Sequence, residues 1–323
     1  MSWHNAPDLE KLAATQLGGK YGAQLWGVDK NGTLYTTYQL SPGGNWSDWR
    51  GPAWNERSNQ SPGPVADVAA AQLEDGRARL WILDMSGRIW SIAQQTTTGV
   101  WGNWEGPNWN QIPGNTKLLK IAAARLTSNK TRVWAITEKG FLTSCTTLAN
   151  SGYSPWLDFP TSGKALSPEG APWTTISACQ QGNGRGALWG IDNKNQLWGM
   201  GQLDNDAWPQ SWVGPNWLEA PKVRKIAAVE MKNQKGACIW AITDDNKIIC
   251  NEQAAPGGNY WFGWTAGDFE NKLRGTDIAG AVQNNNLGRV WVVGTNNFLT
   301  TQGMQLSSPV DWERYWTPPV NQS

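Results

Sequence analysis

Tryptophan is the residue type through which this chain could do most of its chemistry. The sequence holds 24 Trp among 323 residues, against 5 Phe and 6 Tyr. An indole ring offers a broad apolar face and one N–H donor, so it can pack in a core or lie against the C–H face of a ligand such as a sugar. The excess of Trp therefore points to packing, to binding, or to both.

Catalytic side chains are scarce by comparison. The only histidine is His4, which excludes Ser-His-Asp and Cys-His arrangements. No Cys and His spacing is typical of zinc, and no Gly-rich phosphate loop joins a strand to a helix, so we expect no metal and no cofactor. The Ser-x-Asp-x-Gly-x-x-Trp turn of sialidases is absent. A glycoside hydrolase that uses one unrepeated pair of carboxylates stays an alternative.

Charge and composition limit the partners. The formal net charge is +1, which does not favour nucleic acid or an anionic membrane surface. No stretch is long and apolar enough to span a bilayer, so we expect no membrane insertion. The first seven residues lack the basic and apolar regions of a signal peptide, which predicts cytoplasmic synthesis and leaves non-classical release open. Four cysteines do not form a disulfide framework, and we expect them to be buried.

A short phrase with a central Trp recurs along the whole chain. Its apolar neighbours, as in Leu80-Trp81-Ile82-Leu83, lie on both sides of the strand, which is typical of a strand covered on both faces. The Trp residues of the six copies are Trp26, Trp81, Trp134, Trp189, Trp240 and Trp291, at intervals of 51 to 55 residues. A period of this length indicates a repeat architecture, and we expect these six Trp to pack between repeats.

The segments around each phrase complete one repeat. An Ala-rich strand precedes it, as in Val68 to Ala71, which indicates crowding around a central axis. A turn follows it, with a residue tolerant of positive φ at the same place in every copy: Gly32, Gly87, Gly140, Asn195, Asn246 and Asn297. Three of these turns begin with Asp29, Asp84 and Asp192, whose carboxylates we expect to bond the turn backbone rather than to act in catalysis.

A third strand and a Trp-rich fourth strand follow, so each repeat predicts four strands and no helix. We therefore expect an all-β, six-bladed β-propeller with four antiparallel strands per blade and a single domain over 1–323. The predicted repeats are 9–65, 66–117, 118–173, 174–223, 224–275 and 276–323. Residues 1–8, which contain Trp3, are predicted to close the ring beside the last blade.

The fourth strands carry the best candidates for ligand contact, because their Trp residues stand beside polar side chains at the outer part of each blade. These candidates are Trp46, Trp101, Trp156, Trp208, Trp261 and Trp312. The Trp residues that follow a few positions later, Trp49, Trp104 and Trp264, are predicted to be structural. Two further sets stay open between packing and binding: Trp54, Trp109 and Trp217 in Gly-Pro-x-Trp, and Tyr35, Trp90 and Trp198 on the third strands.

Together, the Ala-rich strand, the Arg-Val-Trp phrase, the turn and the terminal Trp-x-x-Trp resemble the repeats of β-propeller lectins from Leu12 to Trp316. The similar groups are the tectonin-like proteins, the Photorhabdus-type propeller lectins and the fungal six-bladed fucose lectins. In the fungal group, a site between blades uses an Arg before the second-strand aromatic residue, a Glu or Gln on the third strand and a Trp on the fourth.

The resemblance assigns candidate positions in this chain. The Arg position is filled by Arg79, Arg132 and Arg289, while the other copies have Gln24, Ala187 and Cys238. The Glu position holds Thr36, Ser91, Ser144, Gly199, Cys250 and Thr301. The resemblance thus implies a propeller lectin whose sugar does not follow from the fucose pattern, with the Arg-bearing second, third and sixth copies as the preferred sites.

The sequence therefore predicts a multivalent carbohydrate-binding protein without catalytic activity, whose partners are glycans or glycoconjugates on cell surfaces. Homo-oligomer formation is left open. The alternative is a protein-interaction scaffold or a toxin-associated targeting propeller, in which the Trp residues grip a protein.

Overall fold

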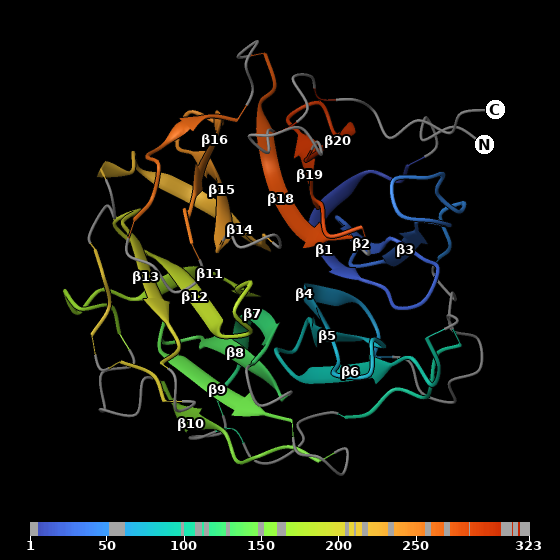
Figure 1. The fold of residues 1–323 in the computed structure, drawn as a ribbon. Coiled ribbons are helices and arrows are strands. Elements are labelled where there is room, and N and C mark those ends of the chain that lie inside the picture. Colours follow the sequence, from blue (N-terminus) through green and yellow to red (C-terminus); the bar gives the residue numbers. More distant parts are fainter. Residues whose placement is uncertain are drawn as a thin grey trace.

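Six small β-sheets make up the chain. A computed structural model describes residues 6–51, 62–97, 100–106, 112, 116–126, 130–147, 152–159, 166–203, 207–209, 211–214, 219–231, 236–255, 260–267, 272–283, 285–304, 312 and 316. Within these ranges there are twenty strands and no α-helix. The sheets stand around a common axis with their first strands innermost, so the chain has the six-bladed propeller arrangement that its repeats predict (Figure 1).

Each sheet, or blade, is an antiparallel meander that runs outward from the axis. The first strands are β1 (Leu9–Gln16), β4 (Val65–Gln72), β7 (Leu118–Arg125), β11 (Trp173–Gln180), β14 (Val223–Glu230) and β18 (Gly275–Val282). The second strands are β2 (Ala23–Asp29), β5 (Ala78–Asp84), β8 (Thr131–Thr137), β12 (Gly186–Asp192), β15 (Ala237–Thr243) and β19 (Gly288–Gly294). The third strands are β3 (Leu34–Tyr38), β6 (Ile89–Ala93), β9 (Leu142–Thr146), β13 (Leu197–Gly201), β16 (Ile248–Glu252) and β20 (Leu299–Gly303).

The outermost segments are less regular than four full strands per blade. Only β10 (Leu157–Asp158) and β17 (Thr265–Ala266) form a fourth strand among the described residues. In the other blades the outer segment makes single bridges, such as Ser91 with Glu105 and Gly199 with Val213. Residues such as Gly102 and Pro209 interrupt these segments, since Gly weakens a strand and Pro lacks a ladder donor.

The first strands of neighbouring blades approach one another closely at the axis, which explains their small residues. A Cβ added to Gly280 of β18 would lie 2.2 Å from Cγ2 of Val229 in the neighbouring blade. The first strands leave an axial cavity in two sections of about 110 and 80 Å³, lined mainly by Ala. Crowding at the axis, rather than strand propensity, therefore selects Ala and Gly here.

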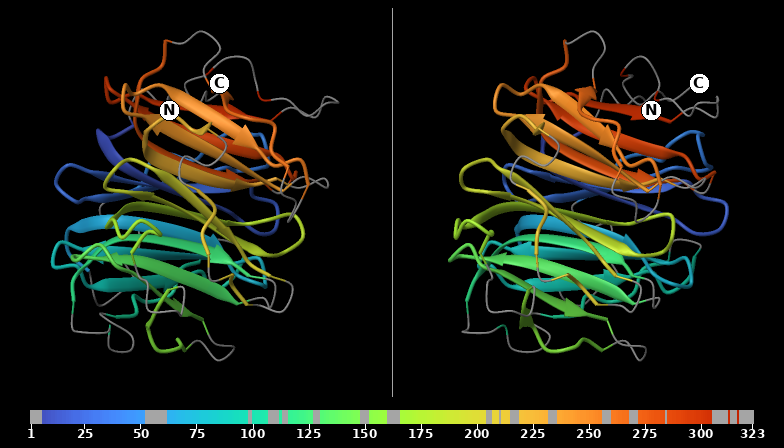
Figure 2. Two further views of the ribbon diagram at one scale, coloured as in Figure 1. Left: turned by 90° about the vertical axis from the view of Figure 1, so that its left-hand side faces the viewer. Right: turned by 60° about the vertical axis from the view of Figure 1, so that its left-hand side comes forward.

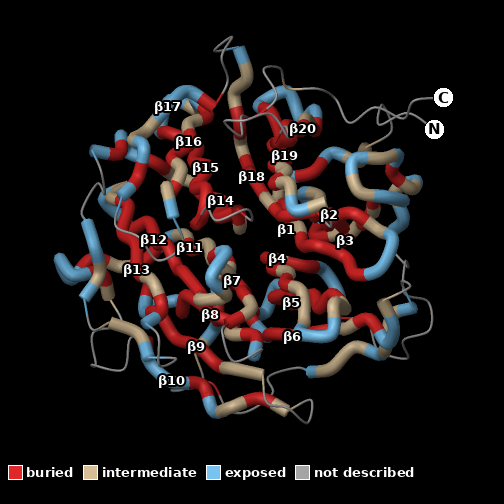
Figure 3. The backbone as a smooth tube through the Cα atoms, viewed as in Figure 1, coloured by how far each residue is buried: buried red, intermediate tan, exposed pale blue. Residues whose placement is uncertain are grey.

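The second strands form the core between blades. Each is buried along almost its whole length, and five of the six repeated Trp side chains have no exposed surface while Trp189 is 3% exposed (Figure 3). Figure 2 shows neighbouring sheets stacked face to face, which covers both sides of these strands. The four cysteines are buried free thiols, and burial raises the pKa of Cys179 and Cys238. The packing role predicted for the repeated Trp is confirmed.

The first and sixth blades pack against each other and complete the ring. One buried cluster joins Leu12 and Leu25 of the first blade to Trp291 and Val293 of the sixth. The backbone N–H of Leu12 donates to Oδ2 of Asp277 at 2.7 Å across this contact. Ala6 packs on the same cluster, while residues 1–5 lie outside the described residues, so the closing role of 1–8 stays a prediction.

The six hairpins between second and third strands share one geometry. The six Gly and Asn residues predicted at the turn all have positive φ, from 60° to 78°. In the second blade, Oδ1 of Asp84 accepts the N–H groups of Ser86 and Arg88 at 2.9 and 3.0 Å. Its Oδ2 accepts the indole N–H of Trp90 at 3.1 Å, and Asp192 bonds Trp198 in the same way. The predicted role of these Asp residues is confirmed, and it ties Trp90 and Trp198 to the turns.

Replacing Asp84 by Ala should lower the free energy of unfolding by about 2 kcal/mol, since buried donors lose a charged acceptor. Burial alone would raise the pKa of Asp84, but bonds from Arg88 and Trp90 and the charge of Arg88 hold that pKa below 3.8. The advantage of the wild type should therefore be complete above pH 3.8 and fade as the pH falls through the lower folded value. Urea unfolding at several acidic pH values measures it. Asp75→Ala is the control, because Asp75 also bonds a turn N–H, that of Arg77, but its side chain is 51% exposed.

Candidate binding sites between the blades

An aromatic side chain from each outer segment inserts between its own blade and the preceding one. We call these the wedge residues: Trp46, Trp101, Tyr153, Trp208, Trp261 and Trp312. Five of them meet the second-strand Trp of the preceding blade edge to face, in the pairs Trp46–Trp291, Trp101–Trp26, Trp208–Trp134, Trp261–Trp189 and Trp312–Trp240. Ring centroids in these pairs are 4.7 to 6.3 Å apart. Five of the six junctions between blades thus contain the same aromatic contact.

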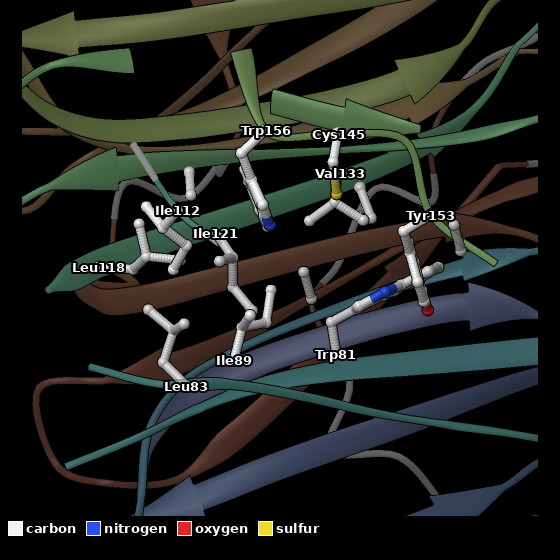
Figure 4. Close-up of a cluster of buried hydrophobic side chains, with 14 residues drawn as sticks. Trp81, Leu83, Ile89, Ile112, Leu118, Ile121, Val133, Cys145, Tyr153 and Trp156 are labelled. Carbon is white, nitrogen blue, oxygen red and sulfur yellow. The ribbon is translucent and has the colours of Figure 1, made fainter. Parts of the chain in front are cut away.

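In the third blade the residue at the wedge position is Tyr153, whereas the sequence pattern aligns Trp156 with the other wedge residues. Tyr153 bridges Thr147, as Trp46 bridges Gln39 in the first blade. Trp156 lies three residues further along the segment and is 2% exposed. Figure 4 shows Tyr153 and Trp156 in one buried cluster with Trp81 of the second blade. Two aromatic residues three positions apart make the sequence alignment ambiguous, and strand pairing resolves it.

The wedge residues are more buried than surface stacking platforms would be. Trp46 is 6% exposed, and Trp261 and Trp312 are each 9% exposed, while Trp101 and Trp208 are half-buried. Their rings are therefore largely used in packing, and only part of each ring is exposed to a ligand. The second-strand Trp residues add donors, because the indole N–H groups of Trp26, Trp134, Trp240 and Trp291 are buried with no acceptor among the described residues.

The three predicted Arg residues lie at three of these junctions. Arg79 faces the third blade, where Tyr153 lies, and Arg132 lies 5.9 Å from the ring centroid of Trp208 in the fourth. Arg289 is on the second strand of the sixth blade, whose Trp291 contacts Trp46 of the first. We refer to these places as the 2/3, 3/4 and 6/1 junctions.

The 2/3 junction is closed by its own side chains. Nη1 of Arg79 donates to the hydroxyl of Tyr153 and lies 3.4 Å from Oε2 of Glu105. The Tyr153 hydroxyl is also 3.0 Å from Oγ of Ser91. Arg79 and Tyr153 are only 7% and 8% exposed, and burial raises the pKa of Tyr153 although the charge of Arg79 opposes this. Tyr153 thus occupies the donors that an incoming ligand would need.

The Arg side chains at the 3/4 and 6/1 junctions are more exposed than Arg79. Arg132 is half-buried, lies over the rings of Phe159 and Trp208, and donates from Nε to Oγ1 of Thr146 at 3.2 Å. Arg289 is also half-buried and donates from Nη1 to Oγ1 of Thr301 at 3.3 Å.

Carboxylates reach the junctions from positions that the family pattern does not predict. Glu105 stands opposite Ser91 in strand register, so its carboxylate approaches the place of the expected third-strand Glu from the neighbouring segment. In the fifth blade, Oε1 of Glu252 accepts the indole N–H of Trp312 at 2.7 Å. Sequence reasoning missed both because it looked only at one third-strand position.

The remaining candidates divide between packing and places outside the described residues. The hydroxyl of Tyr35 lies 3.4 Å from Oδ2 of Asp29, so Tyr35 joins the turn network like Trp90 and Trp198. Trp49 packs on the cluster that joins the first and sixth blades, as expected for a structural residue. Trp54, Trp109 and Trp217 lie outside the described residues.

No group of three or more His, Cys, Asp or Glu side chains that could hold a metal ion occurs in the described ranges. Glu230 lines the smaller section of the axial cavity together with Arg125, while Asp67 and Asp277 near the start of their strands pair with Lys120 and Lys225 respectively. Across the same ranges, no helix has the length and apolar character needed to cross a membrane.

The same arrangement of blades occurs in proteins of known structure. No protein-family model matches the chain, and no curated protein matches its sequence. Among solved structures, AofleA from Arthrobotrys oligospora superposes with a TM-score of 0.65 at 13% identity, over 96% of this chain and 87% of that one. The BP39L lectin from Burkholderia pseudomallei gives 0.62 at 21% identity, over 97% and 86%. The lectin of Aleuria aurantia, described as a six-bladed β-propeller with a novel fucose recognition mode, gives 0.63 at 12% identity, over 97% of both chains. At these identities the likeness establishes the fold, and the chain is a six-bladed β-propeller of the kind found in these lectins.

Proposed function

We propose that this protein is a multivalent, non-catalytic carbohydrate-binding protein whose sugar sites lie between neighbouring blades. The observation that carries the proposal is the repeated junction: a wedge residue from one blade meets the second-strand Trp of the preceding blade. At two junctions, 3/4 and 6/1, a half-buried Arg stands beside this contact. A guanidinium can donate to sugar hydroxyls, and the exposed part of an indole ring can pack on the apolar C–H groups of a sugar.

The neighbours in structure support the same function. The Aleuria aurantia lectin recognises fucose, and the SapL1 lectin forms a complex with α-methyl fucoside. We take fucosides as the first sugars to test. The chain departs from the fungal pattern at the third-strand acid, so a different sugar is equally compatible with the lectin proposal.

The 3/4 and 6/1 junctions are the proposed working sites, with Trp208 and Trp46 as their wedge residues. We infer that the 2/3 junction is blocked by Tyr153, as its hydrogen bonds suggest. Single sites of this kind should bind in the millimolar to micromolar range, or about 4 to 8 kcal/mol. Two sites held on one rigid ring would raise avidity for glycans displayed on a cell surface.

A glycan array with the intact protein tests this function. We expect at least one class of glycan to bind, and titration calorimetry with the corresponding monosaccharide, or with α-methyl-L-fucoside first, should give about two sites per chain. An array without binding, together with a calorimetric null for fucosides, would contradict the proposal. A single site per chain would contradict the repeated-junction geometry while leaving a lectin function in place.

The alternative, a scaffold that binds a protein, has one observation in its favour. Tyr260 and Phe262 on the rim of the fifth blade are 67% and 59% exposed and pack against each other edge to face at 5.6 Å. Exposed aromatic pairs are common at protein interfaces. Loss of a captured protein on Tyr260→Ala, with glycan binding unchanged, would identify this rim as a separate protein-binding surface.

A further inference from the structure

A ring of charged residues surrounds the axis near one end of the cavity. Each blade contributes the residue that follows the irregularity at the start of its first strand, in the same register with its second strand. The six residues of this axial ring are Lys11, Asp67, Lys120, Thr175, Lys225 and Asp277. Three lysines and two aspartates leave one uncompensated positive charge (3 − 2 = +1).

The two carboxylates are fully used by neighbouring blades. Oδ1 of Asp67 lies 3.4 Å from Nζ of Lys120, and Oδ2 accepts the N–H of Ile121 at 2.9 Å. Asp277 pairs with Lys225 at 2.9 Å and accepts the N–H of Leu12. The charge of Asp277 raises the pKa of Lys225, against the effect of burial. These two pairs account for two of the three lysines.

Lys11 is the lysine left over. Its Nζ donates to the backbone oxygen of Ala66, and no carboxylate forms an ion pair with it in the described part of the chain. Burial lowers the pKa of Lys11. Asp67 and Asp277 raise it, while Lys120 and Lys225 lower it further, so the ammonium groups of three blades lie in one electrostatic neighbourhood. An additional negative charge near Lys11 would relieve that repulsion.

Backbone donors converge on the same place. The N–H groups of Leu12 and Ile121 point out of their own sheets, because each donates to an Asp of the preceding blade. The N–H groups of Val68, Ile176 and Ile278 have the same strand register and so point the same way. For each of these three residues, the ring residue of the preceding blade is a lysine, which cannot accept the N–H group. All five residues line the axial cavity section of about 110 Å³. The ring residues directly precede these lining residues in the chain, so one excess positive charge lies next to the N–H donors of a small cavity, which suits an anion.

From this ring we propose that a small monovalent anion, such as chloride or the carboxylate of a small acid, binds on the propeller axis beside Lys11, Lys120 and Lys225. The anion would neutralise the uncompensated charge and accept the N–H groups of the blades whose ring neighbour is a lysine. The site is separate from the junctions between blades.

Chlorine-35 NMR line widths of the intact protein in sodium chloride test the site. We expect a saturable broadening that acetate reverses by competition. Lys11→Met should weaken chloride binding about tenfold or more, since it removes the one uncompensated charge. Lys30→Met is the matched control, because Lys30 is exposed on the β2–β3 turn and lies outside the ring. Circular dichroism establishes that both variants are folded.

A second variant adds a positive charge to the ring instead of removing one. Thr175→Lys should tighten chloride binding by adding a second uncompensated charge at the only uncharged ring position. Equal line widths for wild type, Lys11→Met and Thr175→Lys would overturn the proposal. So would a Lys30→Met protein that loses as much broadening as Lys11→Met, since binding would then be a general surface effect.

Discussion

Trp240→Ala should be among the most destabilising single substitutions in this protein, with a loss of about 3 to 5 kcal/mol in the free energy of unfolding. Trp240 has no exposed surface and lies at the centre of the fifth blade's contact with the sixth. Its ring meets those of Trp312 and Trp316 edge to face, with centroids 4.7 and 5.7 Å away. Removing it leaves a cavity between two sheets that the rigid ring of blades can collapse only in part.

Equilibrium unfolding in guanidinium chloride measures this loss. Trp240→Phe keeps an aromatic ring and should lose clearly less, which separates ring packing from general damage. Phe262→Ala is the surface control, since Phe262 is 59% exposed, and should change stability by about 0.5 kcal/mol or less. A loss of about 1 kcal/mol or less for Trp240→Ala would contradict the conclusion that packing of Trp240 stabilises the contact between the fifth and sixth blades.

A double-mutant cycle isolates the wedge contact itself. Trp312→Ala and the double variant, set against Trp240→Ala, should give a coupling free energy of about 0.5 to 1.5 kcal/mol, as edge-to-face pairs do. A coupling near zero would mean that Trp312 stabilises the junction through its bond to Glu252 rather than through Trp240.

The fold could be predicted from the sequence because the residue pattern of one blade recurs six times along the chain. The interval between Trp81 and its equivalents counts the blades, and the apolar residues on both sides of each Trp predict burial on both faces. The turn was predictable for a related reason: Gly87 and Asn195 share a position where only a residue tolerant of positive φ fits. Each inference rests on local chemistry that recurs in register.

The candidate sites were less predictable because they form between blades. The sequence does not reveal that Trp46 places its ring against Trp291, 245 residues away (291 − 46). In the third blade, Tyr153 and Trp156 both fit the aromatic pattern, and only the bridge from Tyr153 to Thr147 decides between them. Glu105 lies on the segment that pairs with the strand of Ser91, so its carboxylate could not be found from the sequence of that strand alone. The axial ring was missed for the same reason, since its members lie about 50 residues apart and each alone resembles an ordinary surface charge.

Arg132→Ala and Arg289→Ala should each remove one sugar site per chain. Hydrogen bonds to a charged group contribute about 1.5 to 3 kcal/mol, so each loss should weaken its own junction by one to two orders of magnitude. The other site should keep its affinity, because the 3/4 and 6/1 junctions share no blade. Calorimetry with the sugar selected on the array should show the site number fall by one for each variant and binding vanish in the double variant. Arg88→Ala, which removes a half-exposed guanidinium from a turn, is the control and should keep every site.

Tyr153→Ala should have the opposite effect and add a site at the 2/3 junction. Removing the phenol releases Arg79 and Ser91 and leaves Glu105 as an acceptor beside them. Tyr153→Phe keeps the ring in place and should release the donors without making room, so it should add no site. If Tyr153→Ala leaves the site number unchanged while Arg132→Ala and Arg289→Ala lower it, the blocking role of Tyr153 is wrong and the lectin proposal stands. If the Arg variants bind the sugar as the wild type does, the Arg-bearing junctions are not the sites, and the Arg-free junctions, where Trp101, Trp261 and Trp312 are the wedge residues, become the places to test.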